Sequence, residues 1–215
     1  MIERLHYISP PLNSQLEAIE RVLIAGGKWI QLRVKNQTED EVLSLAIEAV
    51  ALCKKHSAKL IVNDYPLVAL KAGAHGVHLG LDDMPIAEAR AILGPKIIIG
   101  GTANTLDHIK LRVDEGADYI GLGPYRFTRT KKNLSPIIGL EGYISLIKQA
   151  KDIGITTPVI AIGGIETTDI SALIAAGVHG IAVSGALTIH PEHTPVIQNL
   201  VHFLLRNSNQ SVTLK

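Results

Sequence analysis

The chain has 215 residues, of which 47% are hydrophobic and 19% are charged, and its formal net charge is +1. This composition is sufficient to bury a sizeable core and excludes an intrinsically disordered chain. A net charge so close to zero gives no bulk attraction to nucleic acid or to a membrane surface, so any positive patch must be local.

The N-terminus and the cysteine content predict the cellular location. Charged residues occur within the first four positions, so no secretory signal peptide is expected, and no uncharged stretch reaches the length that spans a bilayer. The single cysteine, Cys53, lies in a helical pattern and is expected to be a buried thiol that forms no intramolecular disulfide. We therefore expect a cytoplasmic protein with small-molecule partners and no nucleic-acid or membrane partner. The sequence leaves a homo-oligomer open.

Short apolar runs rich in β-branched residues recur along the chain, with helix-patterned segments between them. In chain order the predicted strands span residues 4–9, 29–34, 59–63, 76–80, 96–100, 117–123, 158–163 and 180–185. Several are apolar almost throughout, as strands covered on both faces require. Among the helices, Thr38 and Glu41 predict a capping box at the start of one, and Gly177 is placed to end another.

Eight strands, each followed by a helix, predict the fold class. Strict alternation of strand and helix demands a parallel sheet, and eight such units close it. We therefore predict an α/β protein with a single (β/α)₈ TIM barrel over residues 1–215. The alternative is an open doubly wound sheet, which would carry a glycine-rich fingerprint after its first strand. That position reads PPLNSQ (10–15) instead.

Polar residues gather after the predicted strands, at the end of a barrel where active sites lie. Gln31, Arg33 and Lys35 alternate along the second strand and point to the same side. Three long polar side chains on an interior face require a ligand or solvent at the barrel mouth. The alternative places Arg33 and Lys35 in solvent between helices, but Leu32 and Val34 on the other face suit the helix layer better.

Two carboxylates, Asp64 and Asp83, end the neighbouring third and fourth strands. Such a pair suits a hard, oxygen-preferring cation such as Mg²⁺. The alternative is that each aspartate caps the helix that follows it. Asp82 is expected to be such a cap or an exposed residue, and Asn63 is expected to point away from Asp64 unless the strand has already ended.

Glycine-bearing turns follow the last two strands, at Gly163 and Gly164 and in the segment SGAL (184–187). Backbone amides in such turns approach an anion closely, so a phosphate site is predicted there. No H-E-x-x-H spacing supports a zinc site, and no G-x-S-x-G elbow supports covalent catalysis. The longest break between elements, residues 125–140, is basic, and a loop of that length is usually functional.

Taken together, these segments resemble the thiamine phosphate synthases, also called thiamine-phosphate pyrophosphorylases. The resemblance covers nearly the whole chain and rests on QLRVK (31–35), IVND (61–64), GVHLGLDDMP (76–85), IIGGTANT (98–105), ADYIGLGP with FTRTKK (117–132), PIIGL (136–140), VIAIGGI (159–165) and IAVSGA (181–186). It implies a (β/α)₈ barrel and a transferase reaction. The nitrogen of hydroxyethylthiazole phosphate displaces pyrophosphate from 4-amino-2-methyl-5-hydroxymethylpyrimidine diphosphate, and thiamine phosphate forms by a dissociative substitution.

The resemblance also implies roles for individual residues. Mg²⁺ is expected on Asp64 and Asp83, and the catalytic contacts to the leaving pyrophosphate are expected from Arg33, Lys35 and Lys131. The remaining implied substrate ligands are Gln31, Asn63 and Thr102 for the pyrimidine diphosphate, and Thr128, Thr130, Gly163, Gly164, Val183 and Ser184 for the thiazole phosphate. The loop that carries Lys131 is expected to close over both substrates as a lid.

Two departures from the family pattern bear on these roles. The usual GQxD reads GLDD (80–83), which leaves Asp82 or Asp83 as the acidic ligand, and counting to the following MP favours Asp83. The usual IGxSxH reads with Thr102 for serine and Asn104 for histidine. A related thiazole tautomerase would need that histidine, and a non-catalytic phosphate-binding barrel would not need both aspartates. The synthase is therefore the preferred interpretation.

Overall fold

The computed structural model describes residues 1–11, 14–127, 136–188 and 193–206. The predicted residues Thr128, Thr130 and Lys131, and with them the predicted lid, lie outside this part of the chain. Strands and helices alternate along it, with short additional helical segments near the end. The elements are β1 (Leu5–Ile8), α1 (Gln15–Ile24), β2 (Trp29–Leu32), α2 (Glu39–Lys55), β3 (Lys59–Asn63), α3 (Pro66–Ala72), β4 (Gly76–Leu79), α4 (Ile86–Leu93), β5 (Ile98–Ala103), α5 (Leu106–Asp114), β6 (Tyr119–Leu122), α6 (Gly139–Asp152), β7 (Val159–Ile162), η1 (Thr167–Asp169), α7 (Ile170–Ala175), β8 (Gly180–Val183), α8 (Gly185–Thr188) and α9 (His193–Arg206).

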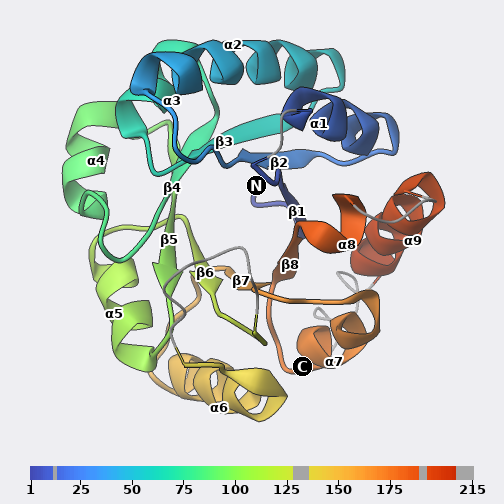
Figure 1. Ribbon diagram of the computed structural model, residues 1–215. Helices are drawn as coiled ribbons and strands as arrows, with labels where there is room; N and C mark the ends of the chain where they lie inside the picture. Colours follow the sequence, from blue (N-terminus) through green and yellow to red (C-terminus); the bar gives the residue numbers. More distant parts are fainter. Residues whose placement is uncertain (12–13, 128–135, 189–192, 207–215) are drawn as a thin grey trace.

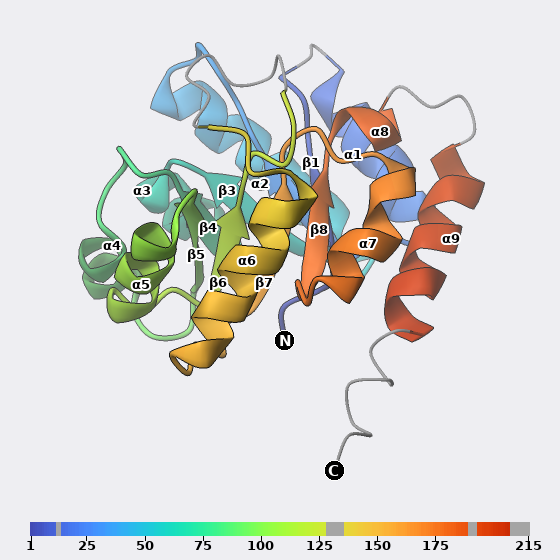
Figure 2. The same cartoon turned by 90° about the horizontal axis from the view of Figure 1, so that it is seen from below.

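The eight strands form one closed parallel barrel in sequence order, with β1 paired to β8. Figure 1 looks into this barrel and shows the helices arranged around it. Figure 2 shows it from the side, with the N-terminus below the barrel and α8 near the opposite rim. The predicted TIM barrel is confirmed and the open sheet is excluded. None of the helices in the described part of the chain is both long and apolar enough to cross a membrane.

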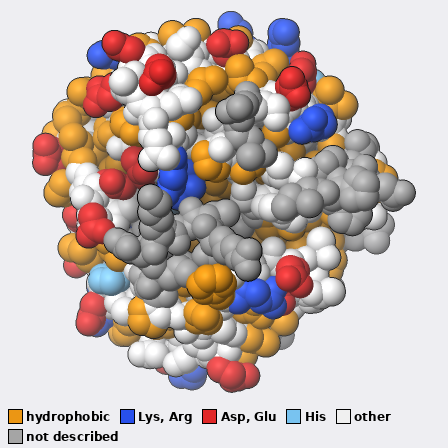
Figure 3. Space-filling view, viewed as in Figure 1, with side chains coloured by type: hydrophobic (Ala, Val, Ile, Leu, Met, Phe, Trp, Pro, Cys, Tyr) orange, Lys and Arg blue, Asp and Glu red, His pale blue; other side chains and the backbone are white. Residues whose placement is uncertain are grey.

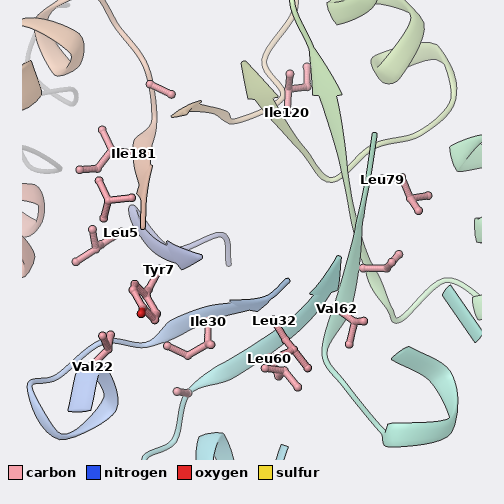
Figure 4. Packing of buried hydrophobic residues seen from close by; sticks show 14 of the residues in the cluster. Leu5, Tyr7, Val22, Ile30, Leu32, Leu60, Val62, Leu79, Ile120 and Ile181 are labelled. Atoms are coloured by element: carbon pink, nitrogen blue, oxygen red, sulfur yellow. The ribbon is translucent and has the colours of Figure 1, made fainter. Parts of the chain in front are cut away.

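Alternate strand residues face two different hydrophobic clusters. Residues such as Leu32, Leu60 and Val62 belong to the large cluster between the barrel and its helices (Figure 4), whereas Trp29, Ile61, Tyr119 and Ile160 form a smaller cluster with Ile8 and Ala182. Since side chains alternate across a strand, Gln31 and Asn63 share the face of Trp29 and Ile61. The same alternation confirms that Leu32 and Val34 pack in the helix layer.

Local sequence signals account for the ends of several elements. Thr38 and Glu41 form the predicted capping box of α2, and Gly177 follows α7 with a positive φ of 97°. Strand β5 extends to Ala103, three residues beyond its predicted end, and both Gly100 and Gly101 lie within it. Their lack of a side chain leaves room for neighbouring groups: a Cβ at Gly100 would lie 2.1 Å from Cζ of Tyr119.

Candidate active site

A cavity of about 650 Å³ opens at the carboxyl ends of the strands. Figure 3 shows this face of the molecule, where Lys or Arg side chains lie near the middle beside acidic side chains. Every predicted site residue within the described part of the chain lines this cavity. These residues are Gln31, Arg33, Lys35, Asn63, Asp64, Asp83, Thr102, Gly163, Gly164, Val183 and Ser184. The structure therefore brings the predicted site together, apart from the three residues that it does not describe.

The basic side of the cavity follows strand β2. Gln31 is only 4% exposed, and Arg33 and Lys35 follow it at the cavity wall, so the alternative that places both in solvent between helices is wrong. The Arg33 backbone is held in place because its N–H donates to Ser9 Oγ at 3.2 Å and its carbonyl accepts from Gln15 Nε2 at 2.8 Å. Burial lowers the pKa of Arg33, while the carboxylate of Asp64 opposes this change.

The acidic side of the cavity is the pair Asp64 and Asp83. Strand β3 ends at Asn63, and Asp64 has a left-handed backbone with φ of 70°. The strand has therefore ended between them, which is the exception that the sequence left open, and both residues line the cavity. Asp83 Oδ2 accepts a hydrogen bond from the Gly80 N–H at 2.6 Å.

Neither carboxylate caps a helix. Helix α3 begins after Tyr65 and α4 begins after Pro85, and neither helix has a side-chain cap. Burial raises the pKa of Asp64, and contact with the Asp83 carboxyl raises it further, while Arg33 and Lys35 act in the opposite direction. Asp82 is exposed at the rim. The carboxyl that acts on Asp64 is therefore that of Asp83 rather than that of Asp82.

The donor chemistry of this pair fits a small hard cation. Two carboxylates that lie close together repel each other when both are ionised, so they favour a shared proton or a bound cation. Within the described ranges, no cluster of three or more His, Cys, Asp or Glu side chains is arranged to hold a metal ion. A pair of carboxylates is nevertheless what Mg²⁺ commonly takes from a protein, because water and substrate phosphates supply its other ligands.

The turn after strand β7 supplies backbone groups to the cavity. Gly163 and Gly164 have φ of 95° and 69°, and a Cβ on Gly164 would lie 2.5 Å from Cγ of Arg126. Arg126 binds the Gly164 carbonyl at 2.9 Å and pairs with Asp169 through contacts of 2.7 and 2.9 Å. These contacts tie the turn to the start of the segment that follows β6.

Several lining residues were not predicted from the sequence, and three of them make hydrogen bonds that organise the site. Ser9 and Arg126 line the cavity and position other site residues, and the signal for Arg126 was its place directly after a strand in a basic segment. The third, His78, alternates with outward-facing residues on β4, and its Nε2 lies 3.1 Å from Thr102 Oγ1. Asn104 also lines the cavity, and its amide donates to the Gly123 carbonyl.

The fold and this cavity define a class of protein: a TIM-barrel enzyme whose barrel mouth carries basic side chains beside a carboxylate pair. The family model described as "Thiamine monophosphate synthase" matches residues 5–187. The chain belongs to the thiamine monophosphate synthase family.

Individual relatives agree with this assignment. The chain is 49% identical over 209 residues to a protein named "Thiamine-phosphate synthase" from Flavobacterium johnsoniae, covering 96% of this chain and 99% of that one. It is 52% identical over 179 residues to a protein of the same name from Bacteroides fragilis, covering 83% and 88%. Among solved structures, thiamine phosphate pyrophosphorylase from Pyrococcus furiosus superposes with a TM-score of 0.83 at 30% identity, covering 95% of this chain and 96% of that one.

Proposed function

We propose that this chain is a thiamine-phosphate synthase, a transferase that joins 4-amino-2-methyl-5-hydroxymethylpyrimidine diphosphate to hydroxyethylthiazole phosphate and releases pyrophosphate. One observation carries the proposal. A single cavity combines two cationic side chains, a carboxylate pair and a glycine turn, in a chain that is 49% identical to a protein of that name along nearly its whole length.

The bond changes set what the protein must do. The carbon–oxygen bond between the pyrimidine methylene group and the diphosphate breaks, and its electron pair leaves with pyrophosphate. The lone pair of the thiazole nitrogen then forms the new carbon–nitrogen bond. Because that nitrogen carries no proton, no general base is required. The protein must therefore stabilise the negative charge on the leaving pyrophosphate and exclude water from the pyrimidinylmethyl cation.

The basic side chains at β2 stabilise the leaving group in this proposal. Arg33 and Lys35 line the cavity from one strand end, where they can bind the diphosphate oxygens. A preorganised contact of this kind typically contributes about 3 kcal/mol to the barrier, or roughly a hundredfold in rate. The family resemblance assigns the same role to Lys131.

Asp64 and Asp83 would hold Mg²⁺, which when bound supplies positive charge to the pyrophosphate oxygens. This assignment rests on the presence of both carboxylates in one cavity and on the causes that raise the pKa of Asp64, namely burial and the Asp83 carboxyl. Asp82 is exposed and is assigned no role in binding the ion.

The two substrates occupy different parts of the cavity in this proposal. Gln31, Asn63 and Thr102 lie on β2, β3 and β5 and face the pyrimidine, whereas the turns after β7 and β8 receive the thiazole phosphate. The residues of these turns are Gly163, Gly164, Val183 and Ser184. Both glycines have positive φ, and a Cβ on either would lie against a neighbouring residue, so a side chain is disfavoured at both positions. In this proposal the backbone amides of the turn bind the phosphate.

The tautomerase alternative gains no support from the cavity. Asn104 stands where that activity would need a histidine, and its amide is hydrogen-bonded to the Gly123 carbonyl. A carboxamide neither accepts nor releases a proton near neutral pH, so it cannot serve as the acid or base of an isomerisation.

The cytoplasm is the location that this proposal assigns. The single Cys53 is buried, and burial raises the pKa of its thiol to about 12, which fits a structural thiol that has no disulfide partner in the chain.

A direct assay tests the proposal. Purified protein with Mg²⁺ and both phosphorylated precursors is expected to form thiamine phosphate, and omission of either precursor is expected to abolish the product. The thiazole carboxylate phosphate that a tautomerase would isomerise serves as the parallel substrate and is expected to remain unchanged. Absence of thiamine phosphate at saturating substrates would contradict the proposal.

A further inference from the structure

Arg112 is a buried cation in the last turn of helix α5, where it is only 2% exposed. Each of its three guanidinium nitrogens has a partner. Nη1 pairs with the Glu115 carboxylate at 2.7 Å. Nη2 donates to the Gly80 carbonyl at 2.8 Å, and Nε donates to the Thr102 carbonyl at 3.2 Å. The side chain therefore joins α5 to the carboxyl end of β5 and to the residue that follows β4.

Strand β5 leaves room for this side chain at Gly101. A Cβ there would lie 2.8 Å from Arg112 Cδ and 2.6 Å from Ile86 Cδ1. Glycine inside a strand weakens the strand and often marks such a close approach, and a buried charge is costly unless it is paired and hydrogen-bonded. Replacement of a buried ion pair by well-packed apolar residues is often neutral or stabilising. Packing alone therefore does not account for an arginine at this position.

Gly80 connects Arg112 to the acidic side of the cavity. Its carbonyl accepts from Arg112, and its N–H donates to Asp83 Oδ2 at 2.6 Å. Both polar groups of this residue are therefore held, although glycine has the greatest conformational freedom of all residues. A Cβ at Gly80 would lie 2.8 Å from the same Asp83 oxygen, so the turn closes tightly on the carboxylate. Gly80 and Asp83 line the cavity, and Arg112 lies behind them.

We propose that Arg112 is a positioning residue that holds the turn from Gly80 to Asp83 and thereby sets the affinity of the cavity for a divalent cation. The inference rests on the proposed function, in which Asp64 and Asp83 hold Mg²⁺, and adds to it a residue outside the cavity. The planar guanidinium binds a carboxylate and two carbonyls at once, so it fixes direction as well as distance. Loss of a group that orients a metal ligand typically lowers metal affinity roughly tenfold to a hundredfold.

Two variants remove the guanidinium in different ways. Arg112→Lys keeps a positive charge for Glu115, but an ammonium group does not reproduce the fork that reaches both carbonyls. Arg112→Met combined with Glu115→Gln removes both charges, so no unpaired charge is left buried. Neither variant changes a side chain that lines the cavity. A loss of cation binding that is common to both therefore reports the missing fork rather than one particular replacement.

The first measurement reads cation binding without any substrate. Mn²⁺ is titrated into the protein at pH 7.5, and the free ion is followed by electron paramagnetic resonance. Both Arg112 variants are expected to raise the dissociation constant of Mn²⁺ at least tenfold relative to the wild type. An unchanged dissociation constant in both variants would overturn the inference. This readout stands apart from the proposed enzyme activity.

The second measurement asks whether Arg112 acts through Asp83. Arg112→Lys is expected to lower the formation of thiamine phosphate about tenfold at limiting Mg²⁺, to recover at saturating Mg²⁺, and to leave KM for the thiazole phosphate within about twofold. In an Asp83→Asn background the same exchange is expected to cost less than about twofold, because the carboxylate that it positions is already absent. An equal cost in both backgrounds would refute the positioning role.

Arg90→Lys is the matched control. Arg90 holds the opposite end of β5, where it donates to the Ile97 carbonyl and pairs with Asp118 at 2.6 Å. Its exchange is expected to lower the melting temperature and to leave Mn²⁺ affinity unchanged; an equal loss of affinity would show a general effect of destabilisation and refute the inference. If the wild type binds no Mn²⁺, the inference and the metal assignment fail together. If the expected Mn²⁺ affinities are found but no thiamine phosphate forms, only the proposed function fails.

Discussion

The exchange of Asp83 for asparagine tests the assignment of the carboxylate pair. Asparagine has nearly the same shape and retains an oxygen that can accept the Gly80 N–H, now bound by Asp83 Oδ2 at 2.6 Å. The turn is therefore expected to stay folded, and the substitution removes chiefly a negative charge. The matched control is Asp82→Asn, because Asp82 is the adjacent aspartate on the same turn and is exposed.

The size of the effect follows from the surroundings of each carboxylate. Loss of one preorganised charge contact at a reacting centre costs about 3 kcal/mol, or roughly a hundredfold in kcat. The Asp83 carboxyl is one of the causes that raise the pKa of Asp64. Its removal therefore makes Asp64 easier to ionise, and an ionised Asp64 offsets part of the lost negative charge. An exposed substitution usually changes free energies by no more than about 0.5 kcal/mol, so Asp82→Asn is expected to alter kcat about twofold or less.

The assay is Mg²⁺-dependent formation of thiamine phosphate, followed at several Mg²⁺ concentrations for the wild type and both variants. Asp83→Asn is expected to lose roughly two orders of magnitude at limiting Mg²⁺ and to recover in part as Mg²⁺ is raised. Equal effects of the two substitutions would refute the pairing of Asp64 with Asp83, and an unchanged Mg²⁺ dependence in Asp83→Asn would refute the metal assignment.

Three further predictions address the other parts of the cavity. Arg33→Met keeps much of the side-chain length and removes the cation, so kcat/KM for the pyrimidine diphosphate should fall roughly a hundredfold while KM for the thiazole phosphate stays the same; an equal rise in both KM values would contradict the role. Gly164→Ala should raise KM for the thiazole phosphate about tenfold, because φ is 69° there and the new Cβ would lie 2.5 Å from Arg126 Cγ. The control is Gly177→Ala, which is also strained, with φ of 97°, but lies outside the cavity. It should lower stability and leave this KM unchanged. Burial and Asp83 raise the pKa of Asp64 from 3.8 to about 7, so ionisation of Asp64 lowers the stability of the metal-free fold as the pH rises to about 7. Mg²⁺ binds the ionised pair, so it should raise the melting temperature more at pH 8 than at pH 5.5. An equal rise at both pH values would refute this.

The barrel and its polar rim were predictable because their signals are local. Each strand is a short apolar run, alternation places Gln31 on the inner face of its strand, and Asp83 was placed at the rim because it follows the fourth strand. Strand β5 was predicted to end at Gly100, three residues before its observed end. The space beside Gly100 is filled by the ring of Tyr119 from β6, and the space beside Gly101 by Ile86 and Arg112, and no local pattern reports such contacts.

The same limit explains the residues that were missed. His78 on an apolar strand has the pattern of a core residue, and only the closed barrel brings its two nitrogens between Tyr119 and Thr102. Asn63 and Asp64 could not both be placed in the cavity from alternation, because the left-handed backbone at Asp64 is a tertiary feature. Arg126 acquires its role from Asp169, which follows in the chain only after another helix and strand.

The measurement that most directly tests the central claim follows one oxygen atom. The pyrimidine diphosphate is prepared with oxygen-18 in the bridge between carbon and phosphorus, and both products of the reaction with thiazole phosphate are analysed by mass spectrometry. Cleavage of the carbon–oxygen bond in this cavity predicts equal amounts of unlabelled thiamine phosphate and labelled pyrophosphate. Absence of label from the pyrophosphate, or release of pyrophosphate without thiamine phosphate, would contradict the account.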